Sequence, residues 1–138
     1  MLSFLSNDME NESYSTIIYE NFFIVLNKIF NTTSNTHVKA IVKPNSLYFQ
    51  IQPSLLFPIL LFLKYNSYAL FRSLIDITVY DFFSNTDVPS TRFHVRYFLL
   101  SHYFNTRLTI MFNISQSYKP ISSITLIYKN AMWGEREI

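Results

Sequence analysis

Three runs of alternating apolar and polar residues in the second half of the chain constrain its fold most. They cover residues 75–80, 93–100 and 107–114. Because successive side chains of a β-strand point to opposite faces of a sheet, this period of two predicts three strands. The short stretch Tyr103–Thr106 separates the last two runs, so we expect them to pair as an antiparallel hairpin. The middle run is partly apolar on both faces, which predicts a central strand.

Two further strands and a helix are predicted upstream of these runs. Residues 38–43 and 47–51 alternate in the same way, and Pro44-Asn45-Ser46 between them predicts a tight turn. Apolar residues recur at helical spacing between residues 15 and 30, which predicts a helix there.

A second helix is predicted at residues 54–65, which are rich in leucine. Pro58 is compatible with it only near the first turn, where backbone amides lack helical partners. The apolar stretch Leu55–Leu63 is about half of the ~20 residues that a membrane span requires, so we expect no transmembrane segment. The predicted buried stripe of this helix consists of Leu56, Ile59, Leu60 and Leu63.

The predicted order of elements is α-β-β-α-β-β-β. This order indicates the α+β class, with helices packed on one face of a mixed or antiparallel sheet. We expect a single domain at residues 15–138, preceded by a polar N-terminal arm at residues 1–14. A short helical turn is expected near Pro120, with Ile121 and Ile124 as its anchors.

The composition favours a subunit over a free-standing protein. Charged residues make up 14% of the chain and hydrophobic residues 49%, whereas soluble domains average about 25% charged residues. A domain of 138 residues has too much surface to hide all of its apolar residues in one core, and large exposed apolar patches usually mark contacts. The net charge of +2, without a basic run, is too small to indicate nucleic-acid binding.

Two residue counts exclude whole classes of cofactor site. The chain contains no cysteine, so it can form no disulfide, thiolate zinc site or iron–sulfur ligation of its own. Its one glycine, Gly134, excludes the glycine-rich loops that hold nucleotide phosphates. We therefore expect no cofactor of these classes in this chain.

No set of polar residues indicates a catalytic or metal site. Asp76 and Asp81 lie five positions apart on one predicted strand, so they face opposite sides and cannot act as an acid–base pair. Asp76 is expected to pair with an arginine or a loop amide instead. Ser101-His102 lacks a nearby acid to orient the histidine. The three histidines are too dispersed for a metal cluster: His37, His94 and His102.

Two other groups of residues suggest binding. Arg92, Arg96 and Arg107 lie among aromatic residues, as in sheets that bind single-stranded nucleic acid. They leave open the alternative of a small RNA- or ribosome-binding module of an organelle.

The densest charge cluster of the chain is Glu135-Arg136-Glu137, which follows Trp133. It lies in the segment of residues 130–138, which is expected to be helical or irregular. It is either a solvated chain end or an ion-pair anchor for a partner.

Several collinear motifs resemble the 30 kDa-type subunit of respiratory complex I, also called NADH dehydrogenase subunit 9. The most specific is the box Trp133-Gly134-Glu135-Arg136-Glu137, which matches the family's tryptophan-x-Glu-Arg-Glu signature. Other matching stretches are Leu55–Lys64, Phe71–Asp81, Arg92–Ser101, Asn105–Leu108 and Pro120–Thr125. Within them the residues read as structural motif positions are Asp76, Asp81, Arg92, Tyr97 and Arg107.

The resemblance implies a non-catalytic structural subunit of NADH:ubiquinone oxidoreductase. Such a subunit lies in the peripheral arm, on the matrix side of the mitochondrial inner membrane. There it braces the quinone-site (49 kDa-type) subunit and neighbouring iron–sulfur subunits. FMN and the iron–sulfur clusters belong to those partners, and electrons pass from NADH to ubiquinone through them. The resemblance makes Trp133, Glu135, Arg136 and Glu137 the expected subunit-interface residues.

The sequence departs from the family pattern at its end. In the family the chain continues past the position of Glu137, through an aspartate and a glycine, into a long tail that embraces neighbouring subunits. The present sequence stops at Ile138. We therefore expect either a separate polypeptide that supplies the tail or a lineage without it.

Overall fold

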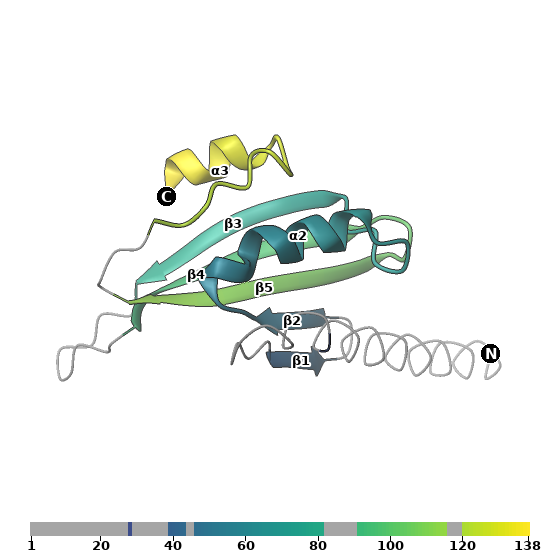
Figure 1. Cartoon of the computed structure of the whole chain (residues 1–138), viewed down its shortest axis with the longest axis horizontal. Helices are drawn as coiled ribbons and strands as arrows, with labels where there is room; N and C mark the ends of the chain where they lie inside the picture. The colour runs from purple at the N-terminus through teal and green to yellow at the C-terminus, as the bar shows by residue number, and fades with distance from the viewer. Residues whose placement is uncertain (1–27, 29–38, 44–45, 82–90, 116–119) are drawn as a thin grey trace, which may run out of the picture.

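A five-stranded sheet with two helices on it makes up the described part of the chain (Figure 1). The computed structural model describes residues 28, 39–43, 46–81, 91–115 and 120–138. The strands are β1 (Lys39–Lys43), β2 (Ser46–Gln50), β3 (Ser73–Asp81), β4 (Thr91–Ser101) and β5 (Thr106–Ser115), and the helices are α2 (Leu56–Tyr65), preceded by a 3-10 turn at Pro53–Leu55, and α3 (Ala131–Glu137).

The sheet is mixed, which confirms one of the two predicted alternatives. The strand order is β1-β2-β5-β4-β3, in which β2 and β5 are parallel and the other neighbours are antiparallel. The predicted hairpin is formed by β4 and β5, and its turn uses Asn105 at a φ of 49°. Asparagine tolerates this left-handed conformation better than most residues. Because β4 lies between β5 and β3, the prediction that it is an internal strand is confirmed.

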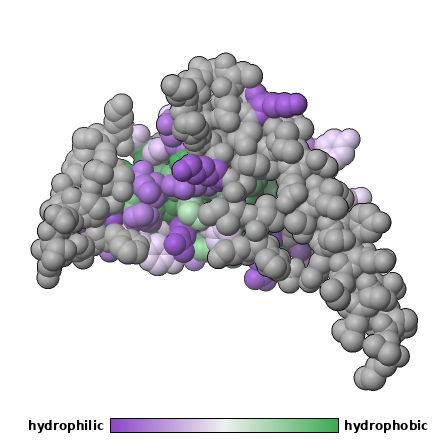
Figure 2. Space-filling view, turned by 90° about the horizontal axis from the view of Figure 1, so that it is seen from below, coloured by the Kyte–Doolittle hydropathy of each residue, from purple (hydrophilic) through white to green (hydrophobic). Residues whose placement is uncertain are grey.

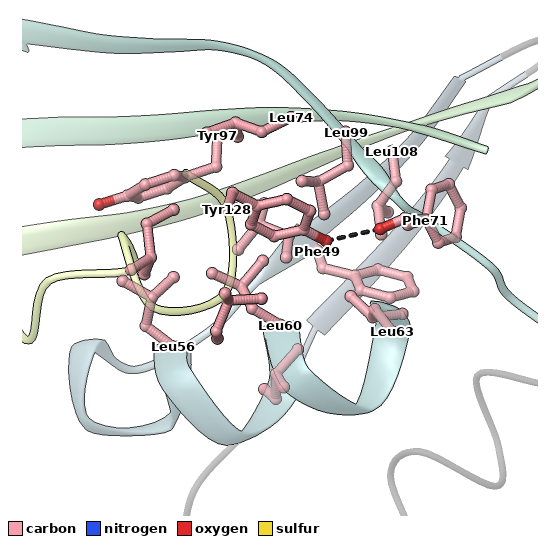
Figure 3. Packing of buried hydrophobic residues seen from close by; sticks show 14 of the residues in the cluster. Phe49, Leu56, Leu60, Leu63, Phe71, Leu74, Tyr97, Leu99, Leu108 and Tyr128 are labelled. Carbon is pink, nitrogen blue, oxygen red and sulfur yellow. Dashed lines mark hydrogen bonds between the residues drawn. The ribbon is translucent and has the colours of Figure 1, made fainter. Parts of the chain in front are cut away.

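One face of the sheet carries the core. The register aligns Ile77 with Tyr97, and Tyr97 with Ile110, so these side chains share a face. The predicted stripe of α2 packs on that face, and all four of its residues are at most 1% exposed. Figure 3 shows Leu56, Leu60 and Leu63 against the side chains of the strands. Burying each such side chain contributes roughly 1.5–3 kcal/mol relative to leaving it in water.

The start of α2 explains why a proline is tolerated there. Pro58 is the third residue of the helix and is exposed. Proline has no backbone N–H, and an N–H at this position of the first turn would have no acceptor within the helix, so no helical hydrogen bond is lost. The helix ends at Tyr65, and the backbone carbonyl of the C-cap residue Asn66 accepts hydrogen bonds from the amides of Ala69 and Leu70. Leu70 has a φ of 48°, an uncommon value for a bulky residue.

The C-terminal helix corrects the predicted order, which ended in a strand. Residues 131–137 are helical, within the segment for which helical and irregular structure were both considered. A helix of this length is marginal alone because its first turn is costly to form. Close packing on β3 supports the helix. Gly134 lies so near to Ile77 that a Cβ added to the glycine would be only 3.2 Å from Cδ1 of Ile77. Since Ile77 is on the core face, α2 and α3 both pack on that face. The predicted pair of helices was α2 and the helix at residues 15–30, so the prediction of a shared face is confirmed only for α2.

Other expectations are only partly tested. The expected turn near Pro120 forms later, at residues 125–127, although Ile124 is fully buried and Ile121 half-buried, as anchors should be. The predicted helix between residues 15 and 30 and the arm at residues 1–14 lie outside the described residues, apart from Lys28.

The described surface is mixed in character. On the side seen in Figure 2, hydrophilic residues lie next to apolar ones. Neither α2 nor α3 has the length and apolar character that crossing a membrane would require.

Candidate subunit interface

The segment that precedes α3 is fastened to the rest of the domain by three side chains. Tyr128 donates a hydrogen bond of 2.6 Å to the buried backbone carbonyl of Phe71 (Figure 3). Asn130 donates from Nδ2 to the carbonyl of Leu74, at 2.7 Å. Lys64 of α2 donates from Nζ to the carbonyl of Ile127 and lies over the Tyr128 ring. These bonds fix where α3 begins on the edge of the sheet.

Glu135 fixes the other side of this segment. Its Oε2 accepts a hydrogen bond of 2.6 Å from the Ser123 hydroxyl, and its Oε1 accepts one of 2.8 Å from the amide of Ile124. Bonds to a charged acceptor are stronger than neutral ones. The carboxylate therefore closes residues 123–135 into a loop. Both carboxylate oxygens of Glu135 are thus used within the chain. That Glu135 also contacts a partner subunit stays a prediction.

Three other residues of the Trp-x-Glu-Arg-Glu box are exposed: Trp133, Arg136 and Glu137. Trp133 is 70% exposed, and its indole Nε1 donates a 2.6 Å hydrogen bond to Glu137 one turn later. Arg136 is exposed and has no ion pair among the described residues. Met132 is also exposed, at 52%. Tryptophan, methionine and arginine are enriched in protein interfaces, so an outward cluster of all three is typical of a contact surface.

An apolar groove of about 400 Å³ lies beside α3. Its lining includes Val79, Val95 and Ile114 from the strands, and Ile121 and Ile138 from the C-terminal segment. The groove can receive an apolar side chain.

Tyr97 and Glu135 contribute to the polar part of that groove, together with Ser122 and Ser123. Burial raises the pKa of the Tyr97 hydroxyl to about 12, and the negative charge of Glu135 adds to the increase. The phenol therefore stays neutral at physiological pH, and it offers no base or nucleophile for catalysis.

The predicted motif positions in the strands have structural partners. Arg92 binds Asp81 through two hydrogen bonds, of 2.7 Å from Nε and 2.6 Å from Nη2. The hydrogen bond from Arg92, followed by its charge, lowers the pKa of Asp81. Asp76 sits beside a β-bulge and accepts a hydrogen bond from the amide of Ile77, the next residue of β3. This partner is neither the arginine nor the loop amide that was expected. The register keeps Asp76 and Asp81 on opposite faces, as predicted.

The arginines do not form one nucleic-acid surface. Arg92 is engaged by Asp81, and Arg96 stacks over the ring of Tyr80, 4.8 Å from its centroid. Arg107 is exposed at the opposite end of the sheet from Arg92. This separation removes the main support for the RNA- or ribosome-binding alternative.

The histidines do not form a metal site in the described residues. His94 lies within β4 and His102 in the β4–β5 turn, where its Nε2 is 2.8 Å from the hydroxyl of Ser73. Ser101, not His102, is buried, so the two form no nucleophile–base pair. Within the part of the chain that the structure covers, no three metal-ligating side chains converge. His37 lies outside the described residues.

No sequence pattern predicted that Tyr128, Asn130 and Lys64 fasten the segment before α3 to the rest of the domain. Each acts on a backbone carbonyl more than 50 positions away. Their only distinguishing feature in the sequence is that they are polar residues next to apolar ones, and this feature does not indicate which carbonyl each of them binds.

Comparisons with known proteins agree with the sequence motifs. The family model described as "Respiratory-chain NADH dehydrogenase, 30 Kd subunit" matches residues 49–138. The 30.4 kDa subunit of NADH-ubiquinone oxidoreductase from Neurospora crassa is 38% identical over 88 residues, which are 64% of this chain and 29% of that protein. NADH dehydrogenase [ubiquinone] iron-sulfur protein 3 from Oryza sativa is 38% identical over 85 residues, 60% of this chain and 41% of that protein.

A solved structure supports the fold separately. A trypsin-resistant fragment of Nqo5 superposes with a TM-score of 0.62 at 18% identity, and the match covers 84% of this chain and 87% of the fragment. The chain spans less than half the length of the two relatives above. Although one of them is called an iron-sulfur protein, the present chain has no cysteine to hold a cluster. With a family match over residues 49–138, the chain belongs to the 30 kDa subunit family of the respiratory-chain NADH dehydrogenase.

Proposed function

We propose that this chain is a non-catalytic structural subunit in the peripheral arm of NADH:ubiquinone oxidoreductase. It braces the quinone-site (49 kDa-type) subunit and neighbouring iron–sulfur subunits, which hold FMN and the clusters. Its place is the matrix side of the mitochondrial inner membrane, and the relatives whose names include "mitochondrial" support that location.

One observation carries the proposal: the family's Trp-x-Glu-Arg-Glu box forms a fastened helix that exposes its interface-type residues. Glu135 holds α3 in place from within, while Trp133 and Arg136 face outward. A rigid platform loses little conformational entropy on binding, which favours a bracing role. No described residue set has the geometry of a catalytic site, so the contribution to electron transfer is structural.

Separation of respiratory membranes from the host under native conditions tests the assignment. Mass spectrometry of the NADH-oxidising band should detect this chain together with the quinone-site subunit. Absence of the chain from that band, when it is present elsewhere in the membranes, would overturn the proposal.

A point variant tests whether α3 is the contact. Arg136→Ala should reduce incorporation of the chain into the complex by about tenfold, because arginine is enriched among the minority of interface residues whose truncation costs more than ~1 kcal/mol, and ~1.4 kcal/mol corresponds to tenfold. Lys129→Ala is the matched control, since Lys129 is exposed near the same helix and makes no described side-chain interaction. Equal incorporation of the two variants would show that Arg136 belongs to a solvated helix end.

A further inference from the structure

The loop end of the sheet, away from the groove beside α3, concentrates basic and aromatic residues. Arg72 directly precedes β3 and Arg107 is the second residue of β5, and both are exposed. The register aligns Ser73 with Leu100 and Leu100 with Arg107, so these three residues form one row across the sheet. At the usual strand spacing, Ser73 and Arg107 are about 10 Å apart. Arg72, next to Ser73, and Arg107 therefore lie at the same end of the sheet.

A groove of about 310 Å³ opens at this end, lined by Leu70, Arg72, His102 and Tyr103. The hydroxyl of Ser73 holds His102 through Nε2, at 2.8 Å. Leu70, half-buried, contributes an apolar wall, and its left-handed φ of 48° is maintained by the hydrogen bonds that end α2. Tyr103 is 78% exposed. The groove thus combines an apolar wall with a guanidinium and an imidazole.

No carboxylate of the described residues neutralises this end. Asp81 is bound by Arg92 at the far end of β3, and Glu135 is used within the C-terminal segment. Glu137 lies in α3, and Asp76 accepts from the amide of Ile77 three residues beyond Ser73. Neither Arg72 nor Arg107 has an ion pair in the described part of the chain.

We propose that this groove binds an acidic segment of a partner subunit, in which one apolar side chain is flanked by carboxylates. The apolar side chain contacts Leu70 and Tyr103 in the groove. One carboxylate pairs with Arg72, which lines the groove, and another pairs with Arg107, which lies outside the lining at the same end of the sheet. The planar guanidinium groups suit bidentate contacts with carboxylates. Two arginines are too few for nucleic-acid binding, which depends on many phosphate contacts. The inference rests on the proposed function, because it requires the chain to lie inside a complex.

Zero-length crosslinking in the isolated complex tests the contact directly. Arg72→Lys and Arg107→Lys keep the positive charge and add an amine that a carbodiimide can join to a neighbouring carboxylate. We expect the introduced amines to form amide bonds with aspartate or glutamate residues of one partner segment. The native Lys39, exposed on β1, serves as the internal control for non-specific coupling. Coupling no greater than at Lys39 would overturn the inference.

Charge reversal provides an independent measurement. The double variant Arg72→Glu and Arg107→Glu should lose about tenfold of its retention in the complex at physiological salt, because like charges replace complementary ones. Its circular dichroism melting curve should match the unaltered chain, since both side chains are exposed. Unchanged retention would overturn the inference while the chain's presence in the NADH-oxidising band still supports the proposed function. Salt-sensitive binding of an oligouridine RNA, abolished by the double variant, would assign this end to nucleic acid instead.

Discussion

The hydrogen bond from Tyr128 to the carbonyl of Phe71 gives the sharpest test of how α3 is positioned. Tyr128 is 3% exposed and Phe71 is 1% exposed, so the bond of 2.6 Å is shielded from water. Tyr128→Phe removes the hydroxyl but keeps the ring. The carbonyl of Phe71 then remains buried without this partner, which costs about 1–3 kcal/mol of the free energy of unfolding.

Equilibrium unfolding in urea, followed by far-ultraviolet circular dichroism, measures this loss in the full chain. The midpoint should fall without a change in slope, because the surface exposed on unfolding stays the same. In thermal unfolding the midpoint should fall by roughly 3–10 °C for a chain of this length. Tyr103→Phe is the control: Tyr103 is 78% exposed, and its hydroxyl has no described hydrogen bond. That variant should stay within about 0.5 kcal/mol of the unaltered chain.

If Tyr128→Phe were as stable as Tyr103→Phe, the reasoning would be wrong. The carbonyl of Phe71 would then have to be satisfied by water, and Tyr128 would contribute only its ring to the core. Incorporation into the complex should follow stability, because this bond fixes the start of the segment that leads to α3.

Three further results are expected. Burial raises the pKa of Tyr97 to about 12, so its hydroxyl stays protonated in the folded chain while it ionises in the unfolded chain near pH 10. Between those values Tyr97 should lower the free energy of unfolding by ~1.4 kcal/mol per pH unit, and Tyr128, whose pKa burial also raises, should add to the fall. Urea titrations should show less of this fall in Tyr97→Phe. Gly134→Ala should be nearly neutral in thermal unfolding, because helix propensity offsets the tight contact with Ile77, whereas Gly134→Val should lose about 1–3 kcal/mol. The pKa of Asp81 is lowered by Arg92, so any stability that Asp81→Asn removes should be present at neutral pH and vanish as the pH falls through the carboxyl pKa; a difference that persists in acid would contradict this reasoning.

Much of the described fold could be predicted because its signals are local. The alternation at residues 75–80, 93–100 and 107–114 predicted β3, β4 and β5, and the leucine stripe predicted the buried face of α2. Strand periodicity and helical spacing depend only on residues close together in the chain, so they can be recognised without knowing which distant residues they contact. The resemblance of the C-terminal box likewise led to the family that the model match over residues 49–138 shows.

The sequence by itself therefore determined the class of fold, the lack of cysteine-based chemistry and the family, while tertiary structure decided how the polar residues are used. Glu135 was expected in a contact surface, yet its carboxylate holds Ser123 and Ile124. Arg92 was considered as a phosphate contact, yet it pairs with Asp81 across the β3–β4 ladder. A charged side chain binds whichever partner the fold brings within about 3 Å, and that partner can stand anywhere in the sequence.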